Sequence, residues 1–91
     1  MRGETVIEWS STGIRTVTGQ AATEEAAWRQ TANAAVSLLR EAPAIPCVLL
    51  RVNGAEARLY PAIDEHGQFD ETSTQAMASR LVEDEENELQ L

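Results

Sequence analysis

The sequence predicts a small α+β domain, in which four strands form one antiparallel sheet and two helices pack on one face of it. Three observations lead to this fold class. An Asn-Gly pair at 53–54 separates two short apolar runs, which is the strongest local signal for a hairpin. A second pair of β-rich runs surrounds the polar stretch 10–13. Two other segments repeat apolar residues at helical spacing, so the predicted element order is ββαββα.

The length of the chain limits it to one domain. Its 91 residues have room for a single small core. We expect this core domain to span residues 1–82. We expect residues 83–91 to form an acidic extension of the last helix or a tail.

The first predicted hairpin joins residues 5–9 to residues 14–18, which are rich in β-branched residues. Its register has two alternatives. A four-residue loop places Trp9 opposite Ile14, and a three-residue loop places it opposite Arg15. Which face of the sheet carries Trp9 depends on this choice.

The first predicted helix begins after Thr23, a residue type that caps helix N-termini. The Ala42-Pro43 step closes it, because a proline restricts the residue before it to extended conformations. We expect Trp28 to lie in the core, since it heads the apolar stripe of this helix: Trp28, Ala32, Ala35, Leu39 and Ala42.

The second predicted hairpin joins residues 47–52 to residues 55–60 through the Asn-Gly turn. A two-residue loop places an apolar pair at every second position: Val52 with Ala55, Leu50 with Ala57, and Val48 with Leu59. The other face carries the opposite charges of Arg51 and Glu56, which stabilise the same register. A β-grasp-like pairing of the two hairpins is an alternative arrangement.

The second predicted helix follows a turn at 64–67. Thr72 and Gln75 match a capping box. The expected inward face consists of Met77, Ala78, Leu81 and Val82. Beyond Val82 this apolar stripe stops.

No residue pattern in the chain predicts catalysis, a cofactor or a metal site, so we expect a protein without enzymatic activity. His66 is surrounded by carboxylates, but their spacing matches no established ligand set, and the segment is typical of a polar turn. Cys47 is a single cysteine, which cannot form an internal disulfide and is typical of a partly buried small apolar residue.

Negative charge collects at one end of the chain. Residues 1–60 hold six acids and six arginines, whereas residues 61–91 hold nine acids and one arginine, so this last third carries the net charge of -8. Such a surface repels nucleic acid and anionic membranes and attracts basic proteins. The residues expected to contact a partner are Glu83, Asp84, Glu85, Glu86, Glu88, Leu89, Asp70 and Glu71.

The predicted function is therefore binding to another protein, as an inhibitor or regulator. Five acids over six helical residues place one charge per about 1.8 Å of axis, close to the spacing of about 1.7 Å in duplex DNA. A nucleic-acid-binding protein or nuclease is thus a candidate partner, masked by a nucleic-acid mimic. In size and charge, but through no motif, the chain is similar to phage-encoded anti-defence proteins, including anti-CRISPR inhibitors.

Two alternatives use other partners. An antitoxin or immunity protein would neutralise a basic toxin by the same electrostatics, and an assembly module would form a homodimer through a sheet edge or the helices. The polar start of the chain, its short apolar runs and its single cysteine predict a cytoplasmic protein. The use of arginine without any lysine indicates a bacterial or phage origin.

Overall fold

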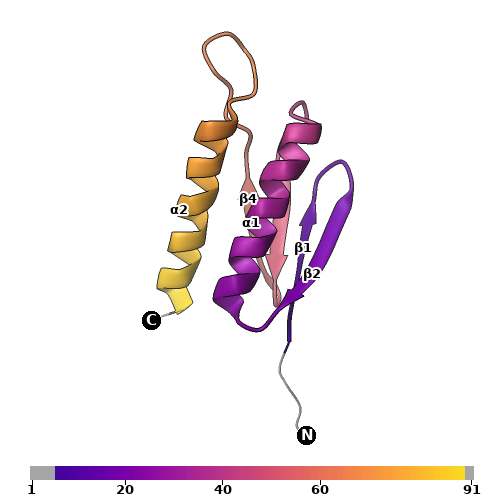
Figure 1. Ribbon diagram of the computed structural model, residues 1–91, viewed down its shortest axis with the longest axis vertical. Coiled ribbons are helices and arrows are strands. Elements are labelled where there is room, and N and C mark those ends of the chain that lie inside the picture. Colours follow the sequence, from indigo (N-terminus) through magenta and orange to yellow (C-terminus); the bar gives the residue numbers. More distant parts are fainter. Residues whose placement is uncertain (1–5, 90–91) are drawn as a thin grey trace, which may run out of the picture.

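The computed structural model describes residues 6–89 of the chain, with side chains described for residues 6–85. Six elements follow one another in the predicted order (Figure 1). They are β1 (Ile7–Thr12), β2 (Thr16–Ala21), α1 (Glu24–Glu41), β3 (Val48–Val52), β4 (Ala55–Leu59) and α2 (Glu71–Leu89).

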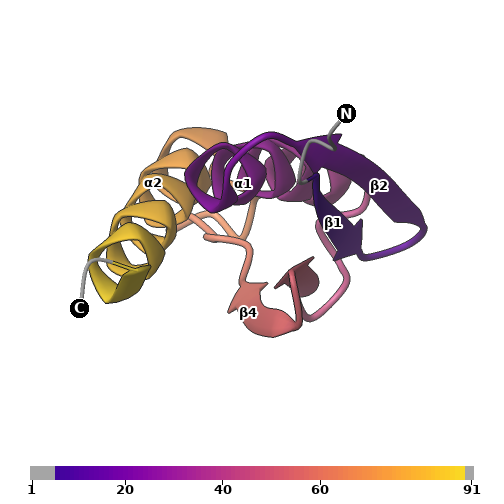
Figure 2. The ribbon, with the colours of Figure 1, turned by 90° about the horizontal axis from the view of Figure 1, so that it is seen from below.

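The four strands form one antiparallel sheet in the order β2-β1-β3-β4. The two hairpins are joined through β1 and β3. Both helices lie on the same side of this sheet, with α2 beside α1 and away from β2 (Figure 2). The predicted α+β fold class is confirmed.

The β3–β4 hairpin has the predicted turn and register. Asn53 and Gly54 adopt φ angles of 49° and 89°, the left-handed values that a type I′ turn requires. All three predicted apolar pairs are found, and Arg51 stands opposite Glu56 and forms an ion pair with it. Turn chemistry and side-chain alternation agree here, which explains why this prediction was accurate.

Both predicted registers of the β1–β2 hairpin are wrong. Trp9 pairs with Gly19, and Thr12 pairs with Thr16, so the loop consists of residues 13–15. The polar stretch that was expected to form the turn instead extends β1. As a consequence, the two strands run further along the chain than their β-branched composition indicates.

A buried hydrogen-bond network explains why polar residues continue β1. The Ser11 hydroxyl is fully buried against α1, where it lies 2.7 Å from the Thr31 carbonyl oxygen and 2.6 Å from the Thr31 hydroxyl. The Thr31 hydroxyl donates to the Ser10 carbonyl at 2.9 Å. Because these polar groups satisfy one another, they can be buried at little cost.

Trp9 lies on the helix-facing side of the sheet, at the border of the core. Its indole N–H donates to the Gln30 side chain at 2.9 Å. Its ring occupies the space above Gly19, where an added Cβ would lie 2.4 Å from the ring. Gly19 is therefore required for the ring position and not for a turn.

α1 provides one wall of the core. Thr23 caps it by accepting from the Ala26 N–H at 3.1 Å, and Ala42 closes it, both as predicted. Trp28 is 2% exposed, which confirms its place in the core. The buried residues of α1, which face the sheet or α2, are Ala27, Trp28, Thr31, Ala32, Ala35, Val36, Leu38 and Leu39.

The predicted start of the second helix is wrong by about two residues. Asp70, and not Thr72, caps α2: its carboxylate accepts from the Ser73 N–H at 3.0 Å and from the Ser73 hydroxyl at 2.9 Å. Both residue types suit a cap. With Asp70 as the cap, Glu71 stands in the first turn, where it pairs with Arg40 of α1.

α2 packs mainly on α1. The side chains of Thr74, Ala78 and Val82 are buried at this contact, one helical turn apart. Leu81 is half-buried against the core. Met77 is 38% exposed, so its expected place on an inward face is wrong.

Neither described helix combines the length and the apolar character needed to cross a bilayer.

Candidate partner-binding surface

The predicted partner-binding residues fall into two groups at opposite ends of α2. Asp70 and Glu71 stand at its start, and the acids from Glu83 onwards stand at its end. Glu83 lies twelve positions after Glu71 along the helix, which corresponds to about 18 Å. The structure therefore does not bring the two groups together into one acidic patch.

Asp70 and Glu71 have structural partners of their own. The hydrogen bonds from the Ser73 backbone N–H and hydroxyl hold the pKa of Asp70 below its ordinary value. The guanidinium of Arg40 donates to both carboxylate oxygens of Glu71, at 2.7 and 2.8 Å, and this lowers the pKa of Glu71. These two acids attach α2 to its surroundings, which accounts for them without a binding partner.

The second group, here called the acidic end, consists of Glu83, Asp84, Glu85, Glu86 and Glu88. α2 continues as a helix through all five positions to Leu89. Glu83 and Asp84 are exposed and Glu85 is half-buried. The side chains of Glu86, Glu88 and Leu89 lie outside the described residues.

Arginine is distributed differently over the rest of the molecule. Four arginines each pair with a glutamate: Arg15 with Glu41, Arg29 with Glu25, Arg40 with Glu71, and Arg51 with Glu56. Among the described side chains, neither Glu83 nor Asp84 has an ion pair. Residues 6–60, with five acids and five arginines, are thus balanced in charge, whereas Glu83 and Asp84 have no such pairing within the described part of the chain.

Two hollows flank the second half of α2. One, of about 360 Å³, runs between α1 and α2, and its lining includes Gln75, Ser79 and Glu83. The other, of about 340 Å³, is lined by a single stripe of α2: Met77, Arg80, Leu81, Asp84 and Glu85.

Helix geometry shows on which side the stripe lies. Successive helical residues are about 100° apart around the helix axis. The buried residues Thr74, Ala78 and Val82 therefore separate the two hollows. The stripe from Met77 to Glu85 lies on one side of them, and the interhelical hollow lies on the other. The interhelical hollow involves the exposed Arg29 and Asn33 and opens away from the sheet. The stripe therefore lies on the sheet side of α2, where apolar Met77 and Leu81 precede acidic Asp84.

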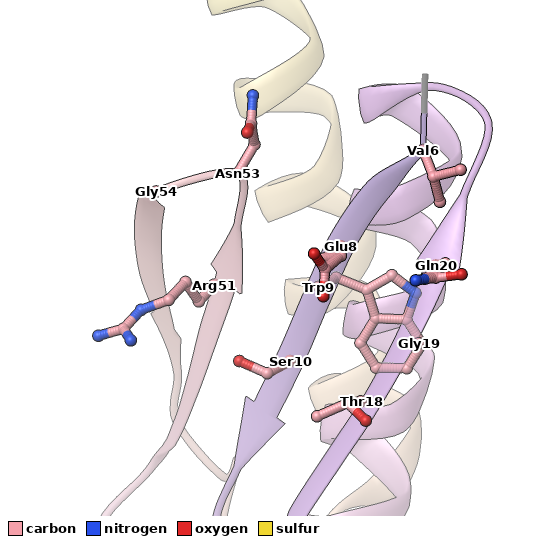
Figure 3. A pocket seen from close by; sticks show the side chains of 10 residues that line it. All are labelled: Val6, Glu8, Trp9, Ser10, Thr18, Gly19, Gln20, Arg51, Asn53 and Gly54. Carbon is pink, nitrogen blue, oxygen red and sulfur yellow. The ribbon is translucent and has the colours of Figure 1, made fainter. Parts of the chain in front are cut away.

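An open hollow of about 720 Å³ is lined by residues of β1, β2, β3 and the β3–β4 turn, among them Trp9 (Figure 3). In Figure 3 the Arg51 side chain extends away from Trp9, and it pairs with Glu56 on the neighbouring strand. The lining contains neither histidine nor cysteine, and no hydrogen bond joins the hydroxyl of Ser10 to Glu8, the carboxylate of this lining. This arrangement can accept hydrogen-bonding groups but offers no activated nucleophile.

His66 stands on an exposed turn, as the sequence indicates. The Asp64 carboxylate accepts from the backbone N–H groups of His66 and Gln68 at 2.8 and 2.9 Å, and Gly67 has a φ of 77°. Within the described residues, histidine, cysteine and carboxylate side chains form no group of three that could hold a metal ion. Cys47 is free and half-buried.

Sequence reasoning missed the exposure of Met77 and its stripe, because the inward face was assigned without knowing which element α2 packs on. A signal was present, since small residues recur at positions 74, 78 and 82 and mark the closest approach to α1.

Comparisons with protein-family models, with curated proteins and with solved structures find no match to this chain.

Proposed function

We propose that this protein is not an enzyme but binds another protein, covering a basic surface on it with the acidic end of α2. The observation that carries this proposal is the continuation of α2. The helix extends beyond Val82, the last buried residue among the described side chains, and carries its acids on a helical element. Acids near a helix C-terminus oppose the helix dipole, so they do not serve the stability of the helix.

Two features support binding over simple solvation. Glu83 and Asp84 have no ion pair among the described side chains, so they can pair with basic groups of a partner. The exposed Met77 and half-buried Leu81 lie on the same stripe as Asp84. Charges of this kind speed encounter, and neighbouring apolar contacts slow dissociation.

The spacing of the acids supports a more specific version. On a helix they follow one another about as closely as the phosphates of duplex DNA. We therefore propose that the covered surface is a nucleic-acid-binding site, as in a nuclease or an anti-defence target.

The test is a quantitative capture experiment. The protein is immobilised, a bacterial lysate is passed over it at low and moderate salt, and retained proteins are identified by mass spectrometry. The variant E83Q/D84N/E85Q should lose the retained partner or bind it at least about tenfold more weakly. The control E8Q/E24Q/E65Q removes the same number of charges elsewhere and should bind as the wild type does.

Competition with duplex DNA tests the proposal that the covered surface is a nucleic-acid-binding site. If the partner's site binds nucleic acid, a short duplex should displace the protein from its partner. Equal retention of the same partner by the two triple variants would contradict a role for the acidic end. If salt but not DNA displaced the protein from its partner, the proposal of nucleic-acid mimicry would be contradicted, but the proposal that the acidic end binds a basic surface would not.

A further inference from the structure

The sheet ends on one side at β4, whose outer backbone groups have no strand beside them among the described residues. β4 pairs with β3 on its inner side. α2 packs on α1 and is set apart from β4 over most of its length (Figure 2). Ala55 is exposed and Ala57 is half-buried, so this edge is open for pairing.

The turn determines which backbone groups point outwards. In a hairpin with a two-residue loop, the residues that flank the loop form a hydrogen-bonded pair, and such pairs alternate along the strands. Val52 and Ala55 flank the loop. The N–H and C=O groups of Ala55, Ala57 and Leu59 therefore point to β3, and those of Glu56 and Arg58 point to solvent.

This pattern is complementary to itself. If a second β4 runs antiparallel with Ala57 opposite its own copy, Glu56 stands opposite Arg58 of the second molecule and Arg58 opposite its Glu56. These are also the positions whose backbone groups are free. One register thus satisfies the hydrogen bonds and pairs opposite charges twice, which stabilises cross-strand neighbours.

Arg58 lacks an ion-pair partner among the described side chains, in contrast to Arg51, which pairs with Glu56. A second copy would supply one. The opposite edge of the sheet has no comparable signature, because β2 has the uncharged sequence TVTGQA. Exposed Tyr60 and Ile63, both 53% exposed, follow β4 directly and add apolar surface near this edge.

We propose that the protein forms a symmetric dimer through β4, joining two four-stranded sheets into one continuous antiparallel sheet centred on Ala57. A lone strand pair buries less surface than a standard interface of about 1,600 Å², so the dimer is in exchange with monomer at micromolar concentrations. This proposal does not depend on the acidic end of α2 or on its partner.

Charge exchange between two variants tests the register. Arg58→Glu places two Glu–Glu pairs at the interface, and Glu56→Arg places two Arg–Arg pairs there. Each variant alone should dimerise at least about tenfold more weakly than the wild type. An equimolar mixture of the two variants should dimerise again, because both interface glutamates of one chain then face both interface arginines of the other.

The measurement is sedimentation equilibrium from micromolar to several hundred micromolar protein, where a dimer has twice the monomer mass of 9.9 kDa. Thr18→Glu on β2 is the matched control and should leave the dimer unchanged. Circular dichroism verifies that each variant is folded. Arg58→Glu is opposite the uncharged Leu49 on β3, so it should fold normally. Glu56→Arg removes the ion pair with Arg51 and places two arginines opposite each other in one hairpin, so its folding is the one that this measurement must establish.

Four results would overturn the proposal. The wild type could sediment as a monomer throughout this range. The dimer could persist unchanged in Arg58→Glu. The mixture of the two charge variants could fail to associate, or Thr18→Glu could abolish the dimer and so assign it to the β2 edge.

Discussion

α1 and α2 have nearly the same length, 18 and 19 residues, but they are held in very different ways. Eight residues of α1 are buried between the sheet and α2. Among the described side chains of α2, three are buried, and they are no larger than Val82. The fold depends on the first helix, whereas the second is attached through small contacts and keeps most of its surface for other uses.

The largest expected effect on stability comes from the buried face of α1. Trp28→Ala should lower the free energy of unfolding by about 3–5 kcal/mol, because it empties a large buried volume under α1. Domains of this kind have about 5–15 kcal/mol in total, so the variant will be marginally folded at best. Chemical denaturation followed by circular dichroism measures the loss.

Met77→Ala is the matched truncation on α2. It removes a large apolar side chain that is 38% exposed, so the loss should stay below about 1 kcal/mol. Losses of similar size at Trp28 and Met77 would contradict the view that α1 holds the fold and α2 does not.

Buried hydroxyls give an intermediate effect. Thr31→Val on α1 should destabilise by about 1–3 kcal/mol, because it removes the donor to the Ser10 carbonyl and one neighbour of the fully buried Ser11 hydroxyl. Urea denaturation of the variant and the wild type measures this difference.

Thr74→Val is the corresponding change on α2. The Thr74 hydroxyl accepts from the Ala62 N–H at 2.9 Å and donates to the Asp70 carbonyl oxygen at 2.8 Å, and both bonds are part-buried. The loss should be smaller than for Thr31→Val, because no fully buried hydroxyl such as that of Ser11 loses a neighbour. A larger loss would mean that α2 and the loop before it contribute more to stability than their burial indicates.

The sequence predicts a feature accurately when that feature depends on residues close together in the chain. The turn at Asn53-Gly54 and the cap at Thr23 depend on neighbouring residues, and both were found as predicted. The first hairpin failed because its register depends on Ser11, whose hydroxyl needs Thr31, 20 residues away. No local pattern marks a serine that will be buried by a helix.

The candidate surface shows the same limit. The sequence identified the acids as a cluster of charge, but not that Asp70 and Glu71 would be used to fix the start of α2. Two residues fitted the cap chemistry, and the structure uses Asp70, next to the ion pair between Glu71 and Arg40, 31 residues earlier in the chain. The self-complementary charges of β4 follow from its register, which the sequence does predict.

The smallest expected effect concerns the attachment of α2 and depends on pH. The folded protein holds the pKa of Asp70 below its ordinary value of 3.8, so the ionised carboxylate stabilises the fold. This contribution is fully present above the ordinary value and is lost as the pH falls through the lowered one. Asp70→Asn can still accept the capping hydrogen bond but cannot ionise.

The difference in unfolding free energy between the wild type and Asp70→Asn should thus be largest near neutral pH and shrink below about pH 4. Urea denaturation at a series of pH values measures it. Adding salt separates this effect from the exposed Arg40–Glu71 pair, because screening weakens the ion pair more than the cap. If the difference in unfolding free energy instead grew on acidification, the charge of Asp70 would destabilise α2. The helix would then start at Asp70 because of the hydrogen bonds of the side chain and not because of its charge.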